Sequence, residues 1–200
     1  MNQTVKKSTA VIVIALAALC AVVLAVGVMP LLIRESRVIT VGHCYPAFTL
    51  AELTEETDRV EHCRLLEIKP AAYTSATGRA DTVTTDYIFE SLEPEGGFFI
   101  LRLIGGTVED TTVQNSDGTN SLMLTGAEYV LFLNDMEGYV QPASYTVEGA
   151  DGPVTHCYSL MTGSASVFVT GLLNEDGTLS SADGQYTAFP EELAALYGSK

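Results

Sequence analysis

The sequence predicts a mainly β domain, either a barrel or a sandwich with a few short helices, preceded by one N-terminal transmembrane helix. Three observations support this prediction. An uncharged apolar segment of 26 residues occupies positions 8–33. Beyond it, short runs rich in β-branched and aromatic residues are separated by turn sequences that contain Gly, Asn and Asp. Helix signals are few there, and many short strands with few helices are typical of all-β folds.

The apolar segment is long enough to cross a bilayer. As a helix that rises about 1.5 Å per residue it spans roughly 39 Å, whereas the hydrocarbon core needs about 30 Å. A cleaved signal peptide is the second interpretation, although its apolar region is usually only about 7 to 15 residues long. A lipoprotein attached through Cys20 is the third, and the bulky Leu19 before that cysteine disfavours it.

The charges that flank the segment predict its orientation. Lys6 and Lys7 precede it, and the positive-inside rule keeps that end in the cytoplasm. We therefore expect a single-pass protein of the cell membrane whose larger part lies outside the cytoplasm. The expected parts are a cytoplasmic N-terminus (1–7), a membrane helix (8–33), a juxtamembrane segment (34–48) and an extracytoplasmic β domain (49–200).

The part predicted to be exported is strongly acidic. Residues 34–200 contain all 25 acidic residues but only 8 of the 10 basic ones, which gives this part a net charge of −17. Such a surface repels phosphate groups, so nucleic acid is not expected as a partner. About 165 residues are also enough for one domain with a hydrophobic core of its own.

The exported part is expected to begin with a helix and to continue as strands. Thr49 and Glu52 have the spacing of a capping box, and the helix should end near Thr57. Pro190 begins a second helix over 191–197, which Gly198 ends. The strands expected between the two helices are 60–68, 82–92, 98–104, 121–125, 129–133, 138–140, 166–173 and 186–189.

Two motifs within these strands predict how the sheet is built. Gly105-Gly106 permits backbone angles that other residues avoid, which suits a sharp bend or a bulge. Apolar residues fall on both faces of the strand at 129–133. We therefore expect this strand to be central and covered on both sides.

Several segments follow one another in an order that is similar to a known group of proteins. They are Thr49-Leu50-Ala51-Glu52-Leu53, the strand from Asp58 to Ile68, Thr85-Asp86-Tyr87-Ile88-Phe89-Glu90, Ile100-Leu101-Arg102-Leu103-Ile104-Gly105-Gly106, Gly126-Ala127-Glu128-Tyr129-Val130-Leu131-Phe132-Leu133, and Gly138-Tyr139-Val140. This order resembles uncharacterised bacterial membrane-anchored or secreted proteins whose exported part is an OB-like barrel. Over residues 49–147 the resemblance implies an OB-like Greek-key barrel with short flanking helices. It implies no catalytic residues, because the shared motifs are structural.

Each of the three histidines is followed by a cysteine, which gives three candidate metal-binding pairs: His43-Cys44, His62-Cys63 and His156-Cys157. Imidazole and thiolate are preferred ligands of zinc and copper. Adjacent residues of a strand point to opposite faces, however, so His62 and Cys63 should not both reach one metal.

A disulfide is the alternative role for these cysteines, because disulfides persist outside the cytosol. A bond between Cys44 and Cys63 would join the first helix to the first strand and close a loop of about 20 residues. Pairing of either cysteine with Cys157 stays open, as do free thiols.

The sequence contains no Gly-x-Ser-x-Gly, His-Glu-x-x-His or phosphate-loop motif. We therefore expect a non-enzymatic binding or structural module that needs no cofactor and meets a protein of the cell envelope. OB barrels bind through one face and its loops, here the loops near Gly78, Asp117 and Asp151. The alternatives are a metal-binding domain that uses the His-Cys pairs and a protease-inhibitor-like module with an exposed edge at residues 40–46.

Overall fold

The computed structural model describes residues 36–42, 45–74, 82–94, 96–136 and 143–197. The chain divides into two units, Met1–Arg37 and Val38–Lys200, and all but two of the described residues belong to the second. The membrane helix predicted at 8–33 lies outside the described residues. None of the helices in the described part combines the length and the apolar character that crossing a bilayer requires.

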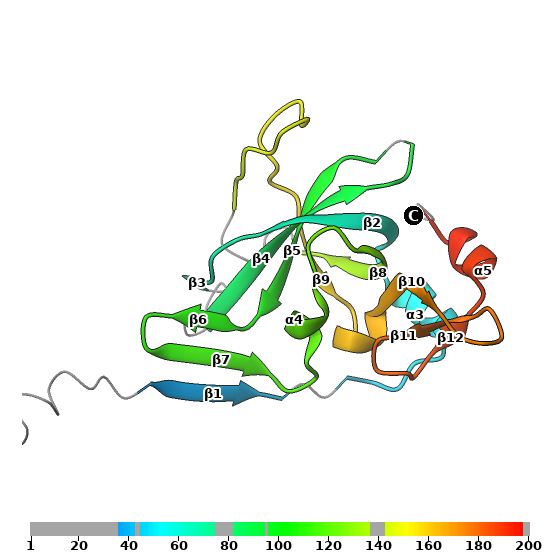
Figure 1. Ribbon diagram of the computed structural model, residues 1–200, viewed down its shortest axis with the longest axis horizontal. Helices are drawn as coiled ribbons and strands as arrows, with labels where there is room; N and C mark the ends of the chain where they lie inside the picture. Colours follow the sequence, from blue (N-terminus) through cyan, green and yellow to red (C-terminus); the bar gives the residue numbers. More distant parts are fainter. Residues whose placement is uncertain (1–35, 43–44, 75–81, 95, 137–142, 198–200) are drawn as a thin grey trace, which may run out of the picture. The chain divides into compact units, whose positions relative to one another are not determined.

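Five strands form a closed barrel, which confirms the predicted β barrel (Figure 1). Around the ring, β2 is followed by β4, β5, β9 and β8, and β8 pairs with β2 again. All neighbours are antiparallel except β5 and β9, which run parallel. The strands are β2 (Arg59–Ile68), β4 (Thr82–Ser91), β5 (Phe98–Ile104), β8 (Glu128–Asp135) and β9 (Cys157–Leu160).

Further strands extend the sheet or lie beside it. From β8 the sheet continues through β10 (Val167–Leu173), β11 (Leu179–Ser181) and β12 (Thr187–Ala188), while β3 (Ala72–Thr74) pairs with β4. A separate three-stranded sheet has the order β1, β7, β6. Its strands are β1 (Arg37–Val41), β6 (Gly106–Val108) and β7 (Thr111–Asn115).

Strand β8 separates two hydrophobic cores, as predicted for a central strand. Tyr129 and Leu131 point into the barrel and pack against residues of β2, β4, β5 and β9. Val130 and Phe132 point outward and pack against β10, β11 and the flanking helices. All four side chains are fully buried, so the alternation of the strand supplies both cores.

The predicted terminal helices are confirmed. Helix α3 (Leu50–Glu56) begins with the expected capping box, in which Thr49 and Glu52 each accept a hydrogen bond from the other's backbone N–H, and Thr57 ends it. Helix α5 (Pro190–Ala194) has proline in its first turn and is shorter than expected. A short 3-10 helix, η2 (Gly163–Ser166), leads into β10.

The strand predicted at 121–125 is wrong, because this region contains the short helix α4 (Thr119–Leu122). The carboxylate of Asp117 accepts a hydrogen bond from the backbone N–H of Thr119. Gly118 adopts φ +71°, and the Ser121 hydroxyl donates to its carbonyl. These local bonds compete with strand pairing and close a helical turn.

The bend predicted at Gly105-Gly106 is confirmed. The two glycines have φ +127° and +125° where the chain leaves β5 and enters β6. A Cβ atom on Gly106 would lie 2.4 Å from the Cβ of Ala71 and 2.7 Å from Oγ1 of Thr85. Both the backbone conformation and the close approach of neighbouring segments therefore require glycine here.

Other strands were not expected from the sequence. The segment 34–48, predicted as a juxtamembrane connection, contains β1, and the short β3, β6, β7, β9 and β11 were also missed. The strand predicted at 138–140 lies outside the described residues. The strands that were missed have three to five residues each, so their pattern of apolar residues is too short to distinguish them from loops.

Candidate functional site on the outer face of β4 and β5

The outer face of β4 and β5 carries a buried ion pair. Asp86 and Arg102 lie directly opposite each other in the register of the two strands. Their neighbours Tyr87 and Leu101 point into the barrel, so the ion pair points out of it. Nε of Arg102 donates to Oδ1 of Asp86 at 2.6 Å, and Nη2 donates to Oδ2 at 2.7 Å. This bidentate geometry fixes both side chains.

A tyrosine from a distant segment completes this cluster. The hydroxyl of Tyr145 donates a hydrogen bond of 2.8 Å to Oδ2 of Asp86, and Nζ of Lys69 lies 5.0 Å from the centre of the Tyr145 ring. Burial, with the hydrogen bond to Asp86, raises the pKa of Tyr145 to about 12. The hydrogen bond to Asp86 raises the pKa of Arg102. The cluster therefore consists of a permanent cation, its carboxylate partner and a protonated phenol.

Two cavities adjoin this cluster and share the lining residues Thr74, Thr84 and Arg102. One has a volume of about 260 Å³ and lies between the segment after β2, β3 and residues 143–145. The other has a volume of about 200 Å³ and extends along β5 and β9 toward Tyr45 and Asn115. The residues that line the two cavities thus present hydroxyl groups, three tyrosines and one buried ion pair along one strip of the barrel surface, an arrangement suited to binding.

The loops predicted to bind lie partly at this strip. Gly78 lies outside the described residues, whereas the segment that contains Asp151 begins at residue 143, beside the larger cavity. The carboxylate of Asp117 accepts a hydrogen bond from the backbone N–H of Ser164 at 3.3 Å, and Thr119 and Gly163 line the smaller cavity. Asp117 therefore helps to position the segments that line the smaller cavity.

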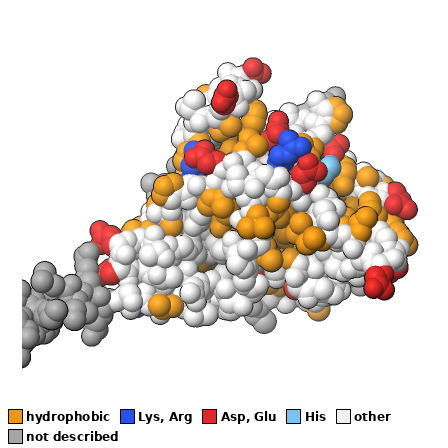
Figure 2. All heavy atoms as spheres, viewed as in Figure 1, with side chains coloured by type: hydrophobic (Ala, Val, Ile, Leu, Met, Phe, Trp, Pro, Cys, Tyr) orange, Lys and Arg blue, Asp and Glu red, His pale blue; other side chains and the backbone are white. Residues whose placement is uncertain are grey.

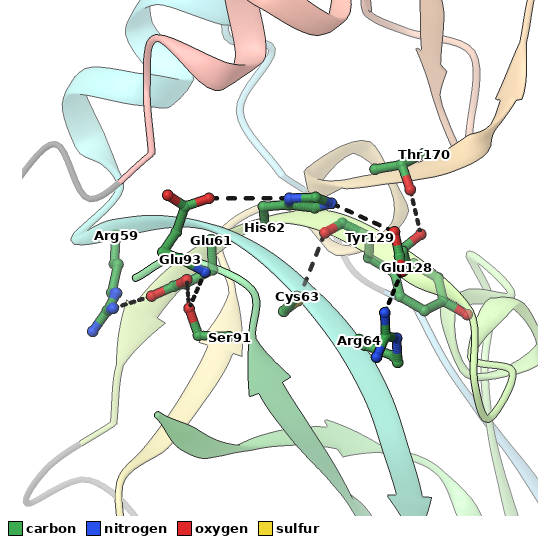
Figure 3. A network of polar contacts seen from close by, with 10 residues as sticks. All are labelled: Arg59, Glu61, His62, Cys63, Arg64, Ser91, Glu93, Glu128, Tyr129 and Thr170. Carbon is green, nitrogen blue, oxygen red and sulfur yellow. Dashed lines mark hydrogen bonds and ion pairs between the residues drawn. The ribbon is translucent and has the colours of Figure 1, made fainter. Parts of the chain in front are cut away.

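His62 and Cys63 point to opposite faces of β2, as predicted for neighbours on a strand (Figure 3). Cys63 is fully buried in the barrel, and its burial raises the pKa of the thiol well above the ordinary value. His62 lies outside, with Nδ1 4.0 Å from Glu93 and Nε2 3.8 Å from Glu128. Its ring stacks on that of Tyr197 at 5.4 Å.

His156 and Cys157 lie at the start of β9. Nε2 of His156 is 3.2 Å from Oδ2 of Asp135, and its ring lies 4.6 Å from that of Tyr158. Cys157 pairs with Ile100 in the strand register and packs in the outer cluster beside β5. Burial raises the pKa of its thiol to about 11.

The structure does not bring the described His-Cys residues together as a metal site. His43 and Cys44 lie outside the described residues, and within the described part no three His, Cys, Asp or Glu side chains gather with metal-binding geometry. Cys63 and Cys157 are both free thiols in the structure, so the Cys63–Cys157 disulfide is not formed, whereas Cys44, proposed as a partner of either one, lies outside the described residues. Of residues 40–46, proposed as an inhibitory edge, the described ones are exposed or half-buried.

The sequence interpretation missed Asp86, Arg102 and Tyr145. A signal was present for Arg102, because it is a charged residue inside the otherwise apolar strand Phe98–Ile104, and buried charges are normally paired. No pattern in the sequence pointed to Tyr145, since its contact with Asp86 spans 59 residues. No family model, curated protein or solved structure matches the chain in the comparisons with known proteins.

Proposed function

We propose that this protein is a membrane-anchored, extracytoplasmic binding module without catalytic activity, and that its barrel is of the OB type. Numbered in chain order, the five barrel strands follow the ring order 1-2-3-5-4-1, and the third and fifth strands are the parallel pair. This order fits a Greek-key barrel of the OB type. The apolar segment at 8–33 supports the anchor.

The observation that carries the proposal is the position of the two cavities. OB barrels bind their ligands on the second and third strands, between the loops that follow the first and fourth strands. Here the larger cavity lies on β4 and β5, between residues 70–74 and 143–145, which belong to those two loops. The binding strip therefore coincides with the face that this architecture uses.

The charge of the domain supports a protein partner over a phosphate-rich one. Figure 2 shows acidic side chains at several places on the face in view and few basic ones. The guanidinium of Arg102 is bound by Asp86 and does not offer an open phosphate site. A polar protein surface of the cell envelope is the partner that fits an anchored, acidic domain.

Cross-linking in the native membrane tests this proposal. Tyr73 is 50% exposed and lines the larger cavity, whereas Phe189, the N-cap residue of α5, is 43% exposed and lines neither cavity. A photoreactive benzoylphenylalanine at Tyr73 of the full-length chain should capture one discrete partner, and the same probe at Phe189 should not.

A substitution that fills the cavity provides the control. Ser144 lines the larger cavity and is exposed, so Ser144→Trp should obstruct the strip without disturbing the core. Capture from Tyr73 should then disappear. Equal capture from both positions, or capture that Ser144→Trp leaves unchanged, would show that this strip is not the binding site.

A further inference from the structure

A third cavity, which also adjoins a buried charge, lies at the mouth of the barrel, where β2 begins. Glu61 lies two residues before Cys63 on β2 and therefore points to the same side, into the barrel. Only 1% of its surface is exposed. The cavity beside it has a volume of about 260 Å³ and is lined by Ser91, the aromatic rings of Phe98, Phe99 and Tyr158, and His156.

The carboxylate of Glu61 is held by one hydroxyl group and one cation. Its Oε2 accepts a hydrogen bond of 2.7 Å from the Ser91 hydroxyl. Its Oε1 forms an ion pair with Nη2 of Arg59 (Figure 3). Nε of Arg59 is buried without a hydrogen-bond partner among the described residues. Arg59 therefore supplies the counter-charge of Glu61 but leaves one of its own donors unsatisfied, a cost that a cation of better fit would avoid.

Arg59 is held less firmly than a structural counter-ion would be. Its side chain is 37% exposed, and it reaches Glu61 from two residues away on the same strand. The buried Glu61 needs a cation beside it, but the partly exposed Arg59 can turn out to solvent when another cation takes its place. Another cation can therefore replace Arg59 beside the carboxylate of Glu61.

The other charges around the mouth favour a cation. Burial raises the pKa of Glu61, and the nearby Glu93 raises it further, against the opposing effects of Ser91 and Arg59. Asp135 adds a third carboxylate beside His156. These carboxylates give the region a negative charge, and the net charge of the chain, −15, attracts cations from a distance.

We propose that this cavity binds the ammonium or guanidinium group of a slender organic cation, which displaces Arg59 and donates to Oε1 of Glu61. The aromatic walls suit the aliphatic part of such a ligand and the faces of its charged group. A free diamine and the side chain of a lysine or arginine in a partner protein share this chemistry. The site lies apart from the strip on β4 and β5, so it does not depend on the binding function proposed there.

Calorimetric titration of the full-length chain in detergent tests the proposal with cadaverine, agmatine and N-acetyl-lysine methylamide. Pentanol, which has a similar chain without the charge, should not bind. Glu61→Gln keeps the shape of the side chain and its bond to Ser91 but removes the charge, and it should weaken the binding of the amines by about tenfold or more.

Two further variants separate binding from folding. Arg59→Gln removes the competing cation and should strengthen amine binding several-fold, a gain that misfolding cannot produce. Glu175→Gln removes an exposed charge from the turn between β10 and β11 and should change nothing. Binding of both cadaverine and the blocked lysine would indicate recognition of any accessible side-chain amine, and binding of cadaverine alone a free diamine.

The proposal is wrong if none of the three amines binds the wild-type chain or Arg59→Gln. It is also wrong if Glu61→Gln binds them as tightly as the wild type. A loss of affinity in Arg59→Gln would equally overturn it, because Arg59 would then assist the ligand instead of competing with it.

Discussion

The barrel contains two arginine-carboxylate pairs that differ in how they are built. Asp86 and Arg102 come from neighbouring strands, lie opposite each other and are 5% and 7% exposed. Arg59 and Glu61 come from one strand, and only the glutamate is buried. The cross-strand pair forms two parallel hydrogen bonds, whereas the other pair meets through one nitrogen of Arg59, and Nε of Arg59 has no hydrogen-bond partner among the described residues.

This difference in geometry separates an ion pair with a structural role from one whose arginine a ligand can replace. Facing strands place a planar guanidinium and a carboxylate edge to edge, which allows bidentate bonding. Two residues on the same strand share a face, but their side chains run alongside each other and meet less well. We therefore expect the first pair to stabilise the fold and the second to be replaceable by a ligand.

The largest effect is expected when the cross-strand pair loses its carboxylate. Asp86→Asn removes the negative charge to which two N–H groups of Arg102 donate, inside a buried environment. Unfolding in urea should show a loss of about 3 kcal/mol or more. The double variant Asp86→Leu/Arg102→Met is the control and should lose much less, because it removes both buried charges together. A small loss in Asp86→Asn alone would remove the distinction between the two pairs.

Loss of the third member of the cluster should have a smaller effect. Tyr145→Phe removes only the hydroxyl that donates to Oδ2 of Asp86. A hydrogen bond to a charged group contributes about 1.5 kcal/mol or somewhat more, and the same urea titration should report that loss. Tyr73→Phe is a matched control, because Tyr73 is half exposed, and its stability should stay close to that of the wild type.

At the mouth of the barrel, Glu61→Gln should change how the stability of the protein depends on pH. Burial raises the pKa of Glu61 above its ordinary value of 4.5. The folded chain therefore keeps a proton that the unfolded chain has lost, so this group lowers stability as the pH rises from 4.5 through the raised pKa.

Thermal unfolding of both proteins across this pH range measures the effect. The variant should lack the decline that the wild type owes to Glu61, so the difference between the two proteins should grow with pH in that window. A difference that does not vary with pH would mean that Glu61 ionises as it does in the unfolded chain.

The smallest expected effect concerns the two described cysteines. Cys63 lies near Glu61, and Cys157 lies near Arg102. Burial raises the pKa of both thiols, so each stays protonated near pH 8 and reacts slowly with iodoacetamide. Peptide mass spectrometry should find Cys63, which is fully buried, modified only in urea, and the partly exposed Cys157 modified slowly in the native chain. If Cys63 reacted only after reduction, the result would indicate a disulfide between Cys63 and Cys44.

The parts of the fold that depend on neighbours in the sequence were predicted well. The capping box at Thr49, the strand over 98–104 and the glycine bend at 105–106 were found where expected. The helix at Thr119–Leu122 was mistaken for a strand, because its four residues carry too little periodicity to distinguish the two. The separation of His62 and Cys63 on opposite faces of β2 was predicted correctly, because it follows from the alternation of neighbours along a strand.

The longer strands, the two terminal helices and the acidic charge could thus be read from the sequence alone, as could the expectation of an apolar anchor. These follow from backbone preferences, capping and composition, which act over a few residues. The tertiary structure alone decided that β9 closes the barrel against β5, that Asp86 meets Arg102 and Tyr145, and that Glu61 lies at a cavity. Each of these depends on the register between distant strands, and one residue of slip would turn the same side chains to the other face.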